Sequence, residues 1–230
     1  MKIALITARI IFVICFPILL FTAAIGIAFN SRWLYQYGFN KYDISAVTGI
    51  SPAELNKAAG GLVRYWNSGE KYIDLTVLKD GQPFTLFNER EIVHLKDVKA
   101  LVWLDYRSLL FAGLYCLVYA TFALWWRRPC FSRELAVASF AGSLASLGLL
   151  AVLGVMALTD FNGFWWQFHI ISFSNDFWLL DPSRDYLIMM FPEGFWFDSV
   201  LVVASLAFSF ALLIGAFSLF KVRRYGAQGK

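Results

Sequence analysis

The chain has 230 residues, of which 59% are hydrophobic, 18% are aromatic and only 16% are charged. A soluble globular domain carries roughly 25% charged residues, so the composition argues against a soluble enzyme and is typical of an integral membrane protein. Cys15, Cys116 and Cys130 are scattered, two of them inside apolar runs, which indicates neither a disulfide framework nor a cysteine-based centre.

Four apolar runs predict membrane spans, because about 20 apolar residues are needed to cross a bilayer. The runs are Ile10–Phe29, Leu109–Trp126, Leu135–Leu158 and Ser199–Phe220. None of them contains a charged residue, so we expect the chemistry to lie at the ends of the spans. The first run follows a short basic start, as a signal peptide does, but its length favours an uncleaved anchor.

Basic residues next to the spans predict the orientation, since Lys and Arg stay preferentially on the cytoplasmic side. They gather on one face, with Glu134 as the accompanying acid: Lys2, Arg9, Arg127, Arg128, Arg133, Lys221, Arg223, Arg224 and Lys230. Both termini are therefore expected to be cytoplasmic. The predicted organisation is 1–29 (N-terminus and first span), 30–108 (extracytoplasmic cap), 109–126 (span), 127–134 (cytoplasmic loop), 135–158 (span), 159–198 (aromatic outer loop with the site), 199–220 (span) and 221–230 (cytoplasmic tail).

Local signals predict a small folded cap within the first outer segment. Ser51, Pro52 and Glu54 form a capping box with proline at the first helical position, so a helix is expected to run to about Asn67. The stretch "YIDLTVLKDGQPFTLF" then alternates around an Asp-Gly pair, which is typical of a β-hairpin turn. The predicted fold class is an all-α membrane protein of four transmembrane helices, with a small extracytoplasmic α+β cap and a membrane-associated second outer loop.

A helix that begins at Asn88 is expected to continue into the second span. Asn88 can cap its N-terminus and Glu91 stands in the capping-box position. Glu91, His94 and Asp97 follow at i, i+3 and i+6, so neighbours in this row can touch. The row is either a solvated helix face or an imidazole whose tautomer is fixed by a carboxylate.

The second outer segment is rich in aromatic residues from Phe161 to Phe197. Aromatics are common at membrane interfaces, but here polar residues interrupt them: His169, Ser172, Ser174, Asn175, Asp176, Asp181, Arg184, Asp185 and Glu193. Pro182 and Pro192 break helices, so the segment is expected to fold down and return. The result would be an apolar cleft with a few polar groups, the usual composition of a ligand site.

Three kinds of chemistry are compatible with these residues. A metal could take mixed ligands from Glu91, His94, Asp97 and His169, although no compact metal motif is present. A serine hydrolase could use Ser172 or Ser174, although no GxSxG elbow exposes a serine. Alternatively the substrate brings its own amine, and an imidazole with a pKa of about 6.5 removes the proton from an α-amino group of pKa about 8.

Two blocks of the sequence resemble a known family. "LFNEREIVHLKDVKALV" (Leu86–Val102) and "FHIISFSNDFWLLDPSRDYLIMMFPEGFWFD" (Phe168–Asp198) are similar to the four-span bacterial membrane proteins that include the lipoprotein intramolecular transacylases, Lit. The resemblance implies that the sn-2 acyl chain of a diacylglyceryl cysteine moves to the α-amine of that cysteine, which gives a lyso-form lipoprotein. It also implies that the catalytic histidines are His94 and His169.

The residues and the resemblance together define the expected site. Around the two histidines, the supporting or substrate-binding residues are expected to be Glu91, Asp97, Ser172, Ser174, Asn175, Asp176 and Trp178. Either Glu91 or Asp97 would orient His94, and Asn175 with a serine would supply oxyanion or amide contacts. We expect no metal and no cofactor.

Diacylated lipoproteins and membrane lipid are the expected partners, without nucleic acid. The expected location is the bacterial cytoplasmic membrane, with an extracytoplasmic active site. A non-enzymatic lipid-binding protein and an exoplasmic lipid esterase or metal-dependent hydrolase remain alternatives. Ala138, Gly142 and Ser146 recur at four-residue spacing and predict close helix packing, either inside the bundle or between protomers.

Overall fold

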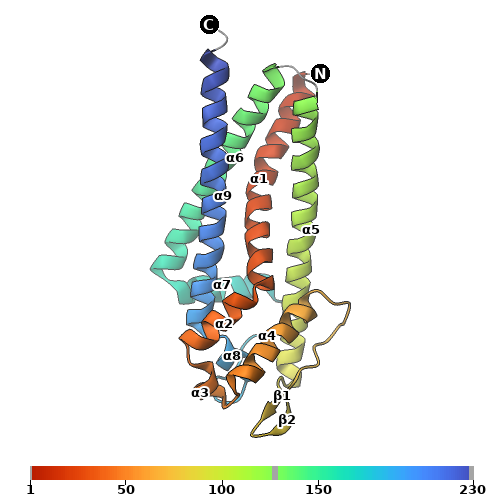
Figure 1. The fold of residues 1–230 in the computed structure, drawn as a ribbon, viewed down its shortest axis with the longest axis vertical. Coiled ribbons are helices and arrows are strands. Elements are labelled where there is room, and N and C mark those ends of the chain that lie inside the picture. The colour runs from red at the N-terminus through yellow and green to blue at the C-terminus, as the bar shows by residue number, and fades with distance from the viewer. Residues whose placement is uncertain (1, 126–128, 228–230) are drawn as a thin grey trace. The chain divides into compact units, whose positions relative to one another are not determined.

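A computed structural model describes residues 2–125 and 129–227 (Figure 1). Within these residues four helices are long and apolar enough to cross a membrane, which confirms the predicted fold class. They are α1 (Lys2–Asn30), α5 (Glu89–Trp125), α6 (Pro129–Thr159) and α9 (Glu193–Ala227). The predicted end of the second span at Trp126, together with Arg127, Arg128 and Lys230, lies outside the described residues.

The chain forms two compact units. Residues 1–25, 105–156 and 203–230 make up the first, here called the helix unit, and residues 26–104 and 157–202 make up the second, the cap unit. The cap unit holds the shorter elements: α2 (Arg32–Lys41), α3 (Ile44–Thr48), α4 (Pro52–Trp66), β1 (Thr76–Lys79), β2 (Gln82–Thr85), α7 (Phe161–Ser172) and α8 (Tyr186–Met190).

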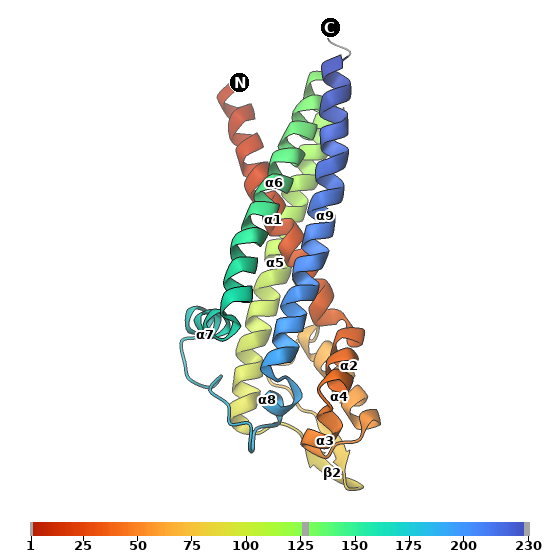
Figure 2. The same ribbon diagram turned by 90° about the vertical axis from the view of Figure 1, so that its left-hand side faces the viewer.

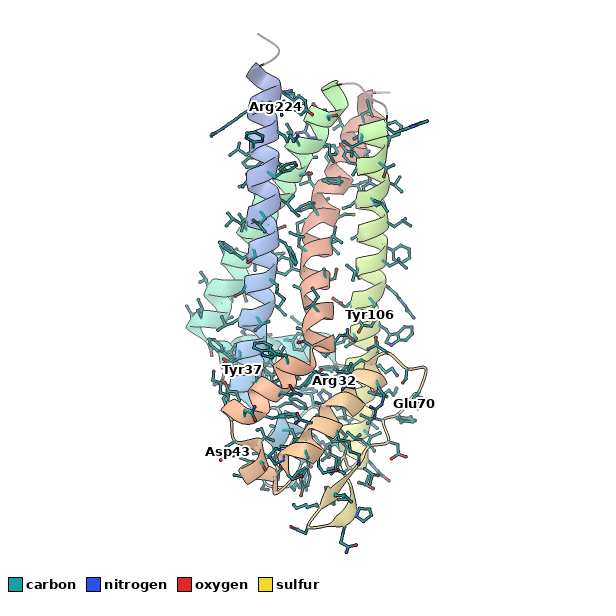
Figure 3. All side chains as sticks on the ribbon, in the orientation of Figure 1. Arg32, Tyr37, Asp43, Glu70, Tyr106 and Arg224 are labelled. Carbon is teal, nitrogen blue, oxygen red and sulfur yellow. The ribbon has the colours of Figure 1, made fainter. Side chains whose placement is uncertain are left out.

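Small residues allow close packing inside the helix unit. Ala138 and Ser146 of α6 are fully buried, and a Cβ on Gly142 would lie 2.7 Å from the side chain of Phe16 in α1. The predicted small-residue contact is therefore internal. Arg9 donates to Glu134 at 2.9 Å, which brings the N-terminal parts of α1 and α6 to one end of the unit, where Figure 3 also shows Arg224 of α9.

The local signals of the cap are confirmed. Ser51 accepts a hydrogen bond from the backbone N–H of Glu54 at 3.4 Å, and α4 follows directly. Strands β1 and β2 pair antiparallel, and the turn residues Asp80 and Gly81 both have positive φ, at 53° and 76°. This left-handed backbone suits the two-residue turn that an Asp-Gly pair predicts.

The second outer segment contains more helix than the sequence indicated. Helix α7 begins after Asp160, whose carboxylate accepts from the Gly163 N–H at 2.9 Å. Figure 2 shows a non-helical stretch of chain, which contains several turns, joining α7 to α8. Pro182 lies in that stretch and Pro192 directly precedes α9, so the chain breaks where the prolines predicted.

Candidate functional site

The start of α5 fixes the position of His94. Asn88 Oδ1 accepts from the Glu91 N–H at 3.1 Å, and Glu91 Oε2 accepts in return from the Asn88 N–H at 2.7 Å. This reciprocal cap sets where the helix begins, and therefore which side chains share a face one turn later. His94 follows at i+3 from Glu91 and is buried.

Glu91 joins α5 to α8. Its side chain is 1% exposed, and its second oxygen accepts from the Leu187 N–H at 2.6 Å. Both carboxylate oxygens are thus bonded to backbone donors. The hypothesis that Glu91 orients His94 finds no support in this geometry, because His94 Nδ1 is buried without a hydrogen-bond partner among the described residues.

Helix α7 sets the orientation of His169. The ring nitrogen Nδ1 lies 2.8 Å from the carbonyl oxygen of Trp165, one turn earlier in the helix. A carbonyl only accepts, so Nδ1 carries the hydrogen, and in the neutral ring Nε2 holds the free lone pair. The helical backbone therefore determines which nitrogen of His169 can act as a base.

The two histidines are neighbours. Their ring centroids are 6.2 Å apart with an interplanar angle of 27°. Phe173 lies against both rings, at 5.0 Å from His94 and 5.6 Å from His169. Trp165 and Trp178 pack on His169 at 5.1 and 4.8 Å. The pair therefore lies among aromatic side chains, in surroundings that disfavour a charged imidazole.

Burial has a direct effect on the proton affinity of His169. It lowers the pKa of His169 below the ordinary value of 6.5. The hydrogen bond to Trp165 favours the protonated ring and offsets only part of that effect. At neutral pH the ring is therefore uncharged and able to accept a proton.

Asp97 anchors the loop that follows α7. Asn175 Nδ2 donates to Asp97 Oδ2 at 2.9 Å, while Asn175 Oδ1 accepts from the Phe177 N–H at 3.1 Å. The Asn175 side chain thus bridges α5 and its own loop, and this leaves one amide hydrogen for other contacts. Asp97 and Asn175 are held together, although 78 residues separate them in the chain.

Arg90 is a site residue that sequence reasoning missed. Its Nη2 donates to the carbonyl oxygen of Asp176. Arg90, His94 and Asp97 stand at i, i+4 and i+7, so they lie along one face of α5. The loop is therefore fastened on both sides of His94, at Asp176 by Arg90 and at Asn175 by Asp97. The i, i+4 spacing from His94 was the signal that could have identified Arg90.

Asp185 is a second missed residue. It is 2% exposed, and its carboxylate accepts from Asn88 Nδ2 at 2.9 Å and from the Asp181 N–H at 2.7 Å. With Glu91 it fastens the chain before and within α8 to the start of α5. The sequence shows Asp185 as a polar residue in an aromatic stretch, but neither its burial nor its partner Asn88 can be read from local spacing.

The remaining expected residues lie at varied positions. Trp178 contacts His169 and also Trp166, at 4.7 Å. Ser172 is half-buried at the end of α7, and Ser174 is exposed. Asp176 contributes its backbone carbonyl oxygen, which accepts from Arg90. Among residues 2–125 and 129–227, no group of three or more His, Cys, Asp or Glu side chains is placed to hold a metal ion.

Known proteins share this architecture. The family model for lipoprotein intramolecular transacylase Lit matches residues 10–196. An uncharacterized protein of Aquifex aeolicus is 28% identical over 207 residues, which cover 89% of this chain and 90% of the relative. The structure of the membrane integral lipoprotein intramolecular transacylase Lit from Bacillus cereus matches with a TM-score of 0.73 at 16% identity, covering 95% of each chain. A variant of that protein with a histidine-to-arginine mutation matches with a TM-score of 0.75 at 16% identity, covering 96% of this chain and 93% of its own.

Proposed function

Because the chain belongs to the lipoprotein intramolecular transacylase family and is thereby a membrane acyltransferase, we propose that it moves the sn-2 acyl chain of a diacylglyceryl cysteine to the α-amino group of that cysteine. The product is the N-acyl, S-monoacylglyceryl form of a bacterial lipoprotein. One observation carries the proposal: His94 and His169 are adjacent, 6.2 Å between ring centroids, in an aromatic environment. Two imidazoles can accept and return protons without a protein nucleophile.

The proton steps follow from the two ring environments. His169 Nε2 takes the first proton from the substrate ammonium and passes it to solvent, because Nδ1 is held as a donor by Trp165. The free amine attacks the ester carbonyl carbon. The attacking nitrogen then loses its second proton, and His94 returns that proton to the glycerol oxygen as the C–O bond breaks. Bonds and charges balance, because the amine gains the acyl group and the glycerol gains a hydroxyl.

The surroundings of the pair suit this substrate. Phe173, Trp165 and Trp178 present apolar surface around the rings, which favours acyl chains and keeps the imidazoles neutral. The amine and the ester belong to one molecule, so holding them in a reactive geometry supplies much of the rate. The transfer needs no soluble acyl donor, and we propose that it uses neither a metal nor a cofactor.

We place the site on the extracytoplasmic side of the bacterial cytoplasmic membrane, with both termini in the cytoplasm. The basic residues that flank the spans support this orientation. The proposed boundaries of spans and loops follow the same reasoning. A reporter protein that is active only in the cytoplasm should show activity when it is fused to the C-terminus. Absence of activity from this fusion would indicate the opposite orientation.

The reaction can be tested with the purified full-length protein and a synthetic diacyl lipopeptide. Mass spectrometry of the N-terminus should show conversion to the N-acyl lyso form without release of free fatty acid. His94→Ala and His169→Ala should each abolish conversion, while Gln82→Ala, at an exposed position of β2, should leave it unchanged. Melting temperatures would establish that the variants are folded. Folded histidine variants with wild-type turnover would refute the assignment, and release of free fatty acid would indicate an esterase.

A further inference from the structure

Helix α2 presents an aromatic face that the proposed reaction does not use. Trp33 and Tyr37 are 60% and 37% exposed, and their rings stack with centroids 5.5 Å apart and an interplanar angle of 20°. The opposite face of α2 is buried through Leu34, Tyr35, Gly38 and Phe39. The core of the cap unit therefore does not require the stacked pair.

Polar groups surround this pair. The α2 platform, as we call it, lines an open groove of about 480 Å³ and consists of Trp33, Gln36, Tyr37, Asn40 and Lys41. Gln36 and Asn40 are exposed and supply amide donors. Lys41 Nζ lies 2.9 and 2.7 Å from the two carboxylate oxygens of Asp198, so its charge is already compensated. The platform thus offers neutral donors and aromatic rings instead of net charge.

The position of α2 in the chain indicates what covers the platform. The apolar run Ile10–Phe29 is about 30 Å long as a helix, which matches the hydrocarbon thickness of a bilayer. Helix α1 ends at Asn30, and only Ser31 separates it from α2. The first turns of α2 therefore lie at headgroup depth, where Trp and Tyr are enriched because one part of each ring system is apolar and another is polar.

We propose that the α2 platform binds the headgroup of a phospholipid. The amides of Gln36 and Asn40 donate to phosphate and ester oxygens. The Trp33 ring, stacked on Tyr37, receives the ammonium of a zwitterionic headgroup, because Lys41 Nζ already lies 5.6 Å from the centroid of the Tyr37 ring. In Figure 2, α2 and α7 lie on opposite sides of the cap unit, so this lipid site is separate from the His94–His169 pair. Lipid bound at α2 would hold the cap unit at the membrane surface.

The test uses the purified full-length chain and dioleoylphosphatidylethanolamine, with retained lipid counted by native mass spectrometry. The double variant Trp33→Ala/Tyr37→Ala should bind this lipid roughly tenfold more weakly than the wild type. Gln36→Glu, which keeps the aromatic pair, should also weaken binding by repelling the phosphate. Tyr72→Ala is the matched control, because Tyr72 is an aromatic of the cap unit outside the platform and its exposure, 47%, lies between those of Trp33 and Tyr37. This variant should bind as the wild type does.

Salt and a second lipid separate headgroup recognition from simple charge attraction. Binding should change little with ionic strength and should not require the anionic dioleoylphosphatidylglycerol, since Lys41 is paired with Asp198. Unchanged retention by both platform variants would overturn the proposal. So would binding to the anionic lipid alone with steep salt dependence, or complete displacement by inorganic phosphate.

Discussion

Replacing Glu91 separates a structural role from a catalytic one. Both carboxylate oxygens of Glu91 are buried and accept backbone N–H groups, from Asn88 at 2.7 Å and from Leu187 at 2.6 Å. In Glu91→Gln the side-chain carbonyl can accept only one of them, and the amide NH₂ faces the other donor. An unsatisfied buried donor costs about 1–3 kcal/mol. Glu91→Ala removes the acceptor of both donors and leaves the buried Leu187 N–H without this partner, so its cost should be at least as large.

The melting temperature measures this cost. In a chain of this length a loss of about 2 kcal/mol corresponds to a shift of roughly 4–8 °C. Glu89→Gln is the matched control, because Glu89 lies in the same first helical turn and loses the same charge but is exposed. We expect Glu91→Gln to melt several degrees below Glu89→Gln, with the pH profile of its remaining lipopeptide conversion unchanged. Equal melting temperatures, or a shifted pH profile with full stability, would refute the reasoning and return Glu91 to the role of orienting His94.

Three further outcomes are expected. Lipopeptide conversion should persist below pH 6.5, because burial lowers the pKa of His169 and the rate falls only when this ring takes up a proton. A pH–rate profile whose acid limb lies at or above 6.5 would contradict this expectation. Arg90→Ala should lower turnover roughly tenfold, because it releases the loop that follows α7. Arg90→Lys can still donate to the carbonyl oxygen of Asp176 and should retain most of the turnover. Wild-type turnover in Arg90→Ala would exclude a role of Arg90 in positioning this loop. Gly142→Ala should cost about 1–3 kcal/mol through the clash with Phe16, measured as a lower melting temperature against Gly148→Ala, whose Cβ meets nothing within 4 Å.

The fold was predictable wherever the signal was local. Long apolar runs, the capping box at Ser51 and the Asp-Gly turn each depend on residues close together in sequence, and each produced the expected element. Helix α2 was missed because its N-cap residue Ser31 is followed by no acidic residue in the first turn, so the capping-box signal is incomplete. Helix α7 was missed because it has no fully buried residue, and aromatic side chains all round a helix leave no periodic pattern to detect.

The site shows the same division between local and long-range information. The row Glu91, His94 and Asp97 suggested one carboxylate–imidazole unit, since neighbours at this spacing can touch. In the folded chain Glu91 bonds to the backbone N–H of Leu187 in α8, and Asp97 accepts from Asn175. These partners lie 96 and 78 residues away, beyond the reach of any spacing rule. Both acids therefore serve long-range contacts, and the second imidazole lies beside His94, with 6.2 Å between the ring centroids. A change of turnover in a variant of either acid is accordingly interpreted first as a displacement of His94.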